Sequence, residues 1–158
     1  LTAVELPFER ERRVAIAADI AGTTSAATPW RIRLVDLHLD ARSSWMNVQR
    51  SFGAGRARQL QFLLEALRDD DTYTVLGGDF NSWAGGASER ALRMPQEWGF
   101  VRATPLGGST WKLRWFLGIL DHVVYRLPPG ASAETREIEG AYGSDHRPLL
   151  GWVRLDPN

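Results

Sequence analysis

The sequence predicts a mixed α/β (α+β) domain in which strands and helices alternate along 158 residues. Short apolar-rich runs recur through the chain, and one longer segment changes to the helical spacing i, i+3, i+4, i+7. Hydrophobic residues make up 44% and charged residues 24%, which is typical of a folded globular domain. Because no linker or shift in composition divides the chain, we expect residues 1–158 to form one domain.

The first part of the chain is predicted to be a hairpin followed by a third strand. Residues 1–8 and 13–20 are apolar runs on either side of the charged cluster at residues 9–12, which indicates the turn. Residues 21–29 are small and polar, as in a loop, and residues 30–39 resume as a strand.

Alternation along this third strand assigns its side chains to two faces. One face carries Val35, Leu37 and Leu39, and the other carries Ile32, Leu34, Asp36 and His38. Because both faces hold apolar residues, we expect both to be at least half buried.

The clearest helix is predicted over residues 55–68. Leu60, Leu63, Leu64 and Leu67 form its apolar face, with Arg56, Gln59 and Glu65 mostly elsewhere.

The second half of the chain continues the alternation of elements. Asp69, Asp70 and Asp71 are a polar stop after the helix, and residues 73–76 form a short strand that ends where Gly77 and Gly78 begin a loop. Residues 88–98 are predicted to be a second helix, with Ser88 as N-cap and Gly99 as its stop. Two further strands, residues 120–127 and 149–155, are separated by a polar stretch that reaches Ser144.

Composition excludes several kinds of chemistry. The chain has no cysteine, so disulfides, thiolate metal sites and a cysteine nucleophile are excluded. Lys plus Arg and Asp plus Glu each number 19, so a polyanionic partner would need a local basic patch. No run approaches the roughly 20 apolar residues of a membrane-spanning helix, and no signal assigns a compartment.

Two polar motifs follow or precede predicted strands. Gly78-Asp79-Phe80-Asn81 follows a buried strand, and in an extended segment Asp79 and Asn81 would point the same way. A carboxylate and an amide on one side can hold a water, a hard cation or a phosphate oxygen, although an Asx-type turn explains the motif equally well. Ser144-Asp145-His146-Arg147-Pro148 precedes the last strand, either as a polar site or as a loop of turn-forming residues.

Three further polar residues lie among apolar neighbours. Asp121 begins a strand and needs a partner there, and the functional interpretation pairs it with His146, which would raise the pKa of that imidazole. His122 points to the opposite face and is interpreted as structural or surface-exposed. His38, between two leucines, would by itself be assigned to the core.

The motifs Asp36-Leu37-His38-Leu39, Gly78-Asp79-Phe80-Asn81, Leu120-Asp121-His122-Val123 and Ser144-Asp145-His146-Arg147-Pro148 occur in this order. Together they resemble the endonuclease/exonuclease/phosphatase superfamily with the deoxyribonuclease-I-like fold. The resemblance implies a sandwich of two mixed sheets with helices outside, and an active site where loops from both sheets meet. Ser109-Thr110-Trp111 matches more loosely a segment that often precedes the Leu-Asp-His motif, and no catalytic role is assigned to it.

The resemblance also implies a role for each motif residue. Asp79 would orient or deprotonate the attacking water, and Asn81 would help hold the water, the scissile phosphate or the metal. Asp145 would assist metal binding, His146 would contact phosphate oxygens, and Asp121 would orient His146.

His38 would be a second phosphate-facing histidine and a general acid. The cofactor implied is Mg²⁺ or Mn²⁺, which oxygen ligands suit better than Zn²⁺.

One departure from the family pattern affects the expected activity. Family members begin with strands that carry an asparagine and the principal metal-binding glutamate, and nothing here matches either; Glu5 and Glu9 are not assigned to that role. The sequence is therefore expected to be the later two thirds of such an enzyme, with its N-terminal strands missing and activity well below that of a complete one. An uncovered sheet edge would then invite self-association.

The expected function is hydrolysis of a phosphoester, as a phosphodiesterase or nuclease. Arginines available for phosphate contacts in a nuclease are Arg42, Arg50, Arg56, Arg58, Arg114 and Arg147. The alternative is a catalytically inactive fragment or binding module of the same fold. DNA, RNA, phospholipid and small phosphoesters all remain open as substrates.

Overall fold

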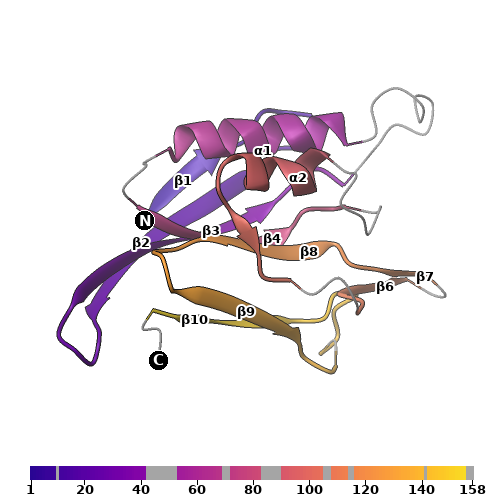
Figure 1. The fold of residues 1–158 in the computed structure, drawn as a ribbon. Helices are drawn as coiled ribbons and strands as arrows, with labels where there is room; N and C mark the ends of the chain where they lie inside the picture. The colour runs from indigo at the N-terminus through magenta and orange to yellow at the C-terminus, as the bar shows by residue number, and fades with distance from the viewer. Residues whose placement is uncertain are drawn as a thin grey trace.

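A six-stranded sheet forms the centre of the fold in the computed structural model (Figure 1). The structure describes residues 1–9, 11–41, 53–68, 72–82, 90–104, 108–113, 116–140 and 142–155. The strand order in the central sheet is β1-β2-β3-β4-β8-β5, in which β3 and β4 are parallel and the other neighbours antiparallel. The strands are β1 Thr2–Glu5, β2 Val14–Thr23, β3 Pro29–His38, β4 Tyr73–Asp79, β5 Val101–Arg102 and β8 Asp121–Arg126.

The two faces of the central sheet are covered differently. Helices α1 (Ala54–Ala66) and α2 (Arg90–Glu97) lie over one face, and the two-stranded sheet of β9 (Ser132–Glu137) and β10 (Leu149–Arg154) lies across from the other (Figure 1). Strands β6 (Trp111–Leu113) and β7 (Phe116–Gly118) form a separate antiparallel pair. The mixed α/β architecture with two layered sheets, predicted from the sequence, is confirmed.

The main core lies between the helices and the central sheet. Leu60, Leu63 and Leu64 of α1 are buried there, as the helical spacing predicts, with Leu37 of β3 and Leu76 of β4 in the same cluster. Burial of such side chains stabilises the fold by about 1.5–3 kcal/mol each.

Two polar residues of α1 are buried as well, contrary to the predicted division of this helix into faces. Arg56 and Gln59 are both almost completely covered. Gln59 compensates for its burial with two hydrogen bonds, because its amide nitrogen donates to the carbonyl of Pro7 and its oxygen accepts the amide of Asp40. The helix therefore fixes the loops at the ends of β1 and β3, which periodicity alone could not reveal.

The second face of β3 differs from the prediction. Val35, Leu37 and Leu39 are buried, but Leu34 is 40% exposed, and Asp36 and His38 are exposed too. The sheet of β9 and β10 does not close over this face, so an apolar groove remains between the two sheets. The expectation that both faces are at least half buried is therefore wrong for Leu34, Asp36 and His38 on the second face.

Strand β4 runs three residues further than predicted, through both glycines to Asp79. Gly77 and Gly78 pair with Asp36 and Leu37 of β3, so they continue the sheet and do not begin a loop. At Gly78 φ is +135°, and a Cβ there would lie 2.0 Å from the carbonyl oxygen of Leu37. Glycine is required here because the two strands approach so closely.

Strand β9 lies in the stretch that the sequence indicated as polar and irregular. Its segment Ser132–Glu137 contains few β-branched or aromatic residues, so its own propensity for a strand is low. It forms because all six residues pair in register with β10, from Ser132 opposite Arg154 to Glu137 opposite Leu149. Tertiary pairing overrides local propensity at this position.

The second predicted helix is confirmed as α2, and Gly99 follows it with φ at +78°, as expected for a helix stop. Its predicted N-cap Ser88, and the acidic stop at Asp69, Asp70 and Asp71, lie outside the described residues. Within the described ranges, no helix is long and apolar enough to cross a membrane.

Candidate active site

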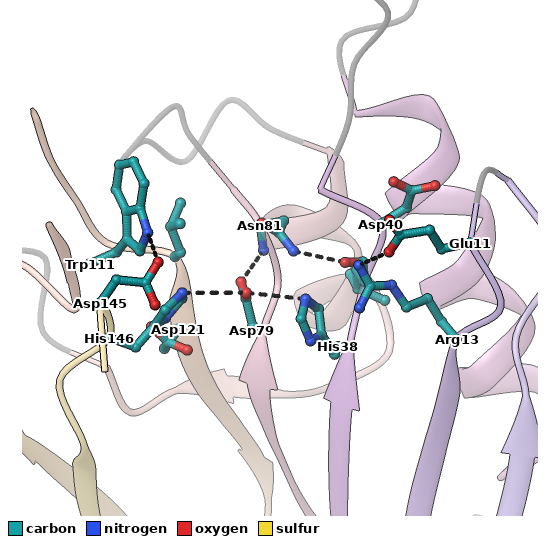
Figure 2. A network of polar contacts seen from close by, with 12 residues as sticks. Glu11, Arg13, His38, Asp40, Asp79, Asn81, Trp111, Asp121, Asp145 and His146 are labelled. Atoms are coloured by element: carbon teal, nitrogen blue, oxygen red, sulfur yellow. Dashed lines mark hydrogen bonds and ion pairs between the residues drawn. The ribbon is translucent and has the colours of Figure 1, made fainter. Parts of the chain in front are cut away.

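Three polar side chains are aligned across the ends of neighbouring strands. In the parallel pair β3 and β4, His38 is opposite Asp79, and in the antiparallel pair β4 and β8, Asp79 is opposite Asp121. Residues at one register position of a sheet project from the same face. Strand pairing alone therefore brings one histidine and two acids from distant parts of the chain to a single edge (Figure 2).

Asp79 lies at the centre of this group, and its two carboxylate oxygens have different partners. Oδ1 accepts the backbone N–H of Asn81 at 2.7 Å. Oδ2 lies 3.4 Å from Nε2 of His38 and 3.9 Å from Nε2 of His146 (Figure 2). One oxygen is thus held by the backbone while the other faces two imidazoles.

His146 reaches the group from the segment that precedes β10. Its Nδ1 lies 2.8 Å from Oδ2 of Asp121, and its backbone N–H donates to the hydroxyl of Ser144 at 3.0 Å. Because a carboxylate only accepts, Nδ1 must carry the proton, and Nε2 is directed to Asp79. The two sheets thus meet at this contact, and the pairing of Asp121 with His146 predicted from the sequence is present in the structure.

These surroundings shift the pKa values of both central groups. Burial would lower the pKa of His146, but the hydrogen bond and charge of Asp121, together with the charges of Asp79 and Asp145, raise it above its ordinary value. Burial also raises the pKa of Asp79, while the hydrogen bond from Asn81 opposes that shift. An imidazole and a carboxyl group, each with a raised pKa, consequently lie side by side.

Asn81 is placed differently from the prediction. Its φ is +49°, so the backbone is left-handed there, and the extended geometry that would align its side chain with Asp79 does not hold. Its buried amide donates to the carbonyl of Leu39 at 2.8 Å, and its backbone N–H closes an Asx-type turn on Asp79. The Asx-type turn is therefore the interpretation of the motif that is present in the structure, and this turn also orients the Asp79 carboxylate.

Asp145 lies beside the group, with an exposed side chain held by a tryptophan. The indole N–H of Trp111 donates to Oδ2 of Asp145 at 3.1 Å (Figure 2). Backbone hydrogen bonds from Lys112 to Asp145 and from Arg147 to Thr110 align the two segments.

Thr110 has a related role at the start of β8. Its hydroxyl oxygen accepts the backbone N–H groups of Leu120 and Asp121, at 3.0 and 3.1 Å. The Ser-Thr-Trp segment thus positions Asp121 and Asp145, and Trp111 also forms a backbone bridge with His146. Its weak match to the family pattern was the available signal in the sequence, but spacing alone could not show these contacts.

His122 is structural and fully buried. It lies on the opposite face of β8 from Asp121, edge-on to the ring of Phe80, and its Nδ1 accepts a hydrogen bond from Arg102 at 3.0 Å. Burial, followed by the charge of Arg102, lowers its pKa to about 3.

The structure describes three of the six predicted phosphate-binding arginines, and each of these is buried or has an acidic partner. Arg56 is buried, Arg58 pairs with Glu9 on the surface, and Arg147 forms an ion pair with Glu137 at the edge of the candidate site. Arg42, Arg50 and Arg114 lie outside the described residues.

The donor atoms present fit a hard divalent cation. One ligand atom each from Asp79, Asp121 and His146 lie within 4.8 Å of one another, and two of the three are carboxylate oxygens. Carboxylate oxygens are the ligands that Mg²⁺ and Mn²⁺ prefer. Among the described residues, the carboxylate of Asp145 is not part of this compact group.

Comparison with protein families identifies one model that extends over most of the chain. The model described as "Endonuclease/Exonuclease/phosphatase family" matches residues 5–146. Two UPF0294 proteins from strains of Vibrio cholerae are each 36% identical to the chain over 104 residues, which are 62% of this chain. That match covers 34% of each relative, so the chain matches about a third of their length.

Solved structures share the fold at low sequence identity. A functionally unknown conserved protein from Enterococcus faecalis has a TM-score of 0.65 at 22% identity, over 92% of this chain and 57% of that one. TDP2 of D. rerio, in complex with a single-stranded DNA product, has 0.63 at 18%, over 96% and 65%. The human Nocturnin catalytic domain with bound sulfate has 0.59 at 20%, over 96% and 56%.

Proposed function

The chain belongs to the endonuclease/exonuclease/phosphatase family, and on this premise we propose that it hydrolyses phosphodiesters with a metal-assisted, activated water. The observation that carries the proposal is the position of Asp79. Its Oδ2 faces the Nε2 atoms of His38 and His146, at 3.4 and 3.9 Å. A carboxylate between two imidazoles can accept a proton beside groups that bind or protonate a phosphoester.

Asp79 is proposed to orient the attacking water and accept its proton. Burial raises the pKa of this carboxyl, which makes it a better base than an exposed aspartate. The hydrogen bond from Asn81 to Oδ1 fixes the carboxylate, so Oδ2 is presented to the water in one orientation. As the water oxygen bonds to phosphorus, the bond from phosphorus to the leaving alcohol breaks, and no covalent enzyme intermediate is required.

The two histidines are proposed to act on opposite sides of the phosphoryl group. The hydrogen bond and charge of Asp121 raise the pKa of His146, and the protonated imidazole is proposed to donate its Nε2–H to a phosphoryl oxygen and stabilise the developing negative charge. His38 is about half exposed, on the other side of Asp79, and is proposed to protonate the leaving oxygen. Each histidine can thus interact with a different oxygen of one substrate.

Mg²⁺ or Mn²⁺ would be held by carboxylate oxygens of Asp79 and Asp121, which belong to the compact group of donor atoms described above, and would offset negative charge on the phosphoryl oxygens. Asp145 and the amide oxygen of Asn81 are proposed as further oxygen ligands. Trp111 contributes by fixing the carboxylate of Asp145.

Nucleic acid is included among the proposed substrates because one structure of the same fold, TDP2 of D. rerio, holds a single-stranded DNA product. The net charge of the chain does not favour the binding of polyanions, because basic and acidic residues are equal in number. Substrate selection must therefore come from groups close to the cleft.

Hydrolysis of bis(p-nitrophenyl) phosphate by the full-length protein tests the proposal. We expect turnover that EDTA abolishes and that Mg²⁺ or Mn²⁺ restores, and a lower rate with the monoester p-nitrophenyl phosphate. Absence of hydrolysis of any phosphoester, with binding of inorganic phosphate retained, would favour the binding-module alternative.

A further inference from the structure

The sheet of β9 and β10, here called the second sheet, carries two residues of the candidate site. Asp145 and His146 lie in the segment that precedes β10, whereas Asp79 ends β4 and Asp121 begins β8 in the central sheet. An apolar groove of about 530 Å³ is lined by residues of both sheets, so the sheets do not close on one another there. The spacing of the site therefore depends on the bonds that hold the second sheet beside it.

Glu137, the last residue of β9, joins three segments of the chain through one carboxylate. Its Oε2 accepts the backbone N–H of Ser109 at 3.0 Å, and its Oε1 accepts from the guanidinium of Arg147. A Cβ added at Gly108 would lie 3.0 Å from Oε2, so the carboxylate packs directly against this part of the backbone. Burial would raise the pKa of Glu137, but the hydrogen bonds from Arg147 and Ser109 lower it below its ordinary value.

On one side, the carboxylate fixes the start of the Ser-Thr-Trp segment. Two residues of this segment hold acids of the site, because Thr110 accepts the backbone N–H of Asp121 and the indole of Trp111 donates to Asp145 (Figure 2). The hydroxyl of Ser109 donates to the carbonyl of Trp111 at 2.8 Å, which links the two ends of the segment. A displacement of Ser109 would therefore move the partners of both acids.

On the other side, the carboxylate fixes Arg147, the residue that follows His146. The Arg147 guanidinium donates to Glu137, and its backbone N–H donates to the carbonyl of Thr110 at 2.8 Å. His146 itself forms a backbone bridge with Trp111. Because the imidazole comes from the second sheet and both of its carboxylate partners come from the central sheet, its position depends on this junction.

From these contacts we infer that Glu137 is a positioning residue, which acts through Ser109 and Arg147 to hold the site residues of the second sheet at their working distances from those of the central sheet. The inference rests on the proposed function and adds a residue that lies outside the four sequence motifs. A carboxylate suits this role because its two oxygens accept two donors at once, one of them charged.

Hydrolysis of bis(p-nitrophenyl) phosphate by the full-length protein with Mg²⁺ tests this inference. Removing a residue that orients the reacting groups typically costs roughly 10- to 100-fold in activity, so kcat should fall by that factor in Glu137→Ala. KM should change by less than about threefold, because the loss is one of alignment. Glu137→Gln keeps an oxygen for Ser109 but turns an amide N–H₂ toward Arg147, so its kcat should lie between those of the wild type and Glu137→Ala.

Asp19→Ala is the matched control variant. Asp19 is also an ion-paired acid of similar exposure, 29% against 22% for Glu137, and its partners are Arg31 and Arg33. It lies on β2 opposite Arg33, in the middle of β3 and away from the site. Its loss should leave kcat unchanged.

A spectroscopic signature separates positioning from an effect on stability. The indole N–H of Trp111 donates to Asp145, so its ¹H–¹⁵N resonance reports on this hydrogen bond in the folded protein. The resonance is assigned by its loss in Trp111→Phe. It should move upfield in Glu137→Ala, as the hydrogen bond lengthens, and keep its position in Asp19→Ala.

The outcomes distinguish this inference from the proposed function. If the wild type hydrolyses the diester and Glu137→Ala changes neither kcat nor the Trp111 resonance, Glu137 is not a positioning residue. A lower kcat without a shift of the resonance would show that the loss comes from reduced stability, and would also overturn the inference. If the wild type hydrolyses no phosphoester, the proposed function is contradicted, and the Trp111 resonance alone decides whether Glu137 positions Asp145.

Discussion

Among the carboxylates that raise the pKa of His146, Asp121 contributes both a hydrogen bond and its charge, so the titration of this imidazole should respond to a single substitution at Asp121. Asparagine at position 121 removes the charge that contributes most to raising the pKa of the imidazole, while burial continues to lower it, so the descending limb of the kcat/KM profile should move to lower pH in Asp121→Asn. The sign follows because the proposed form is the imidazolium, which is lost as pH rises through its pKa. The profile is measured with a phosphodiester substrate.

Asp19→Asn is the matched control for this prediction. Asp19 is an ion-paired acid that binds Arg31 and Arg33 away from the site, and its loss should leave the limb unchanged. An identical descending limb in Asp121→Asn and the wild type would contradict the pairing.

His122 should make the protein sensitive to acid. Its pKa is about 3 in the folded protein and ordinarily 6.5, so the unfolded chain takes up a proton between these values while the folded protein does not. Its contribution to stability is therefore complete above pH 6.5 and falls by about 1.4 kcal/mol per pH unit as pH decreases toward 3.

The variant His122→Asn isolates this contribution, because asparagine can still accept from Arg102 but does not titrate. Urea unfolding at several pH values measures the free energy of unfolding of both proteins. We expect this free energy to decrease less in the variant than in the wild type as the pH is lowered. Parallel curves for the two proteins between pH 6.5 and 4 would show that His122 does not titrate as described.

At the scale of elements, the close approach of β3 and β4 places Asp79 opposite His38, and it depends on Gly78. A methyl group there would lie 2.0 Å from the Leu37 carbonyl oxygen, so Gly78→Ala should cost about 3 kcal/mol or more of unfolding free energy. At Gly77 the nearest atom would be a methyl of Val123 at 3.2 Å, which can move, and Gly77→Ala should cost about 1 kcal/mol. Urea unfolding followed by circular dichroism measures both, and equal costs would count against the close approach.

Elements and site residues could be predicted from the sequence where the residues themselves form a periodic pattern or a recognisable motif. Helix α1 and strand β3 have the periodicity of helix and strand, and the acids and histidines of the site lie in ordered motifs. Strand β9 could not be predicted because its formation depends on β10, and the burial of Gln59 depends on loops distant in sequence. The left-handed turn at Asn81 is likewise fixed by contacts with Asp79 and Leu39.

At the scale of the whole molecule, an apolar groove of about 530 Å³ lies between the central sheet and the sheet of β9 and β10. Its walls include Ile20, Leu34 and Trp152, each about 40% exposed. Exposed apolar surface and unpaired strand edges favour association. We therefore expect residues 1–158 to self-associate as concentration rises, which sedimentation velocity measures.

Leu34→Lys should weaken this association because it puts a charge into the groove. Phe62→Lys is the matched control, since Phe62 is similarly exposed but lies on α1, outside the groove. If the control variant dissociates as readily as Leu34→Lys, the groove is not the associating surface.

The most direct test of the proposed phosphoester hydrolysis is the kcat of Asp79→Asn in the full-length protein, with bis(p-nitrophenyl) phosphate and saturating Mg²⁺. An asparagine oxygen can still accept the Asn81 N–H, so the turn is kept while the proton acceptor is lost. Because a positioned general base contributes roughly 10²- to 10⁴-fold, we expect kcat to fall by about that factor and KM to change by less than about threefold. A kcat within about twofold of the wild type would show that Asp79 does not activate the water and that the reacting centre lies elsewhere.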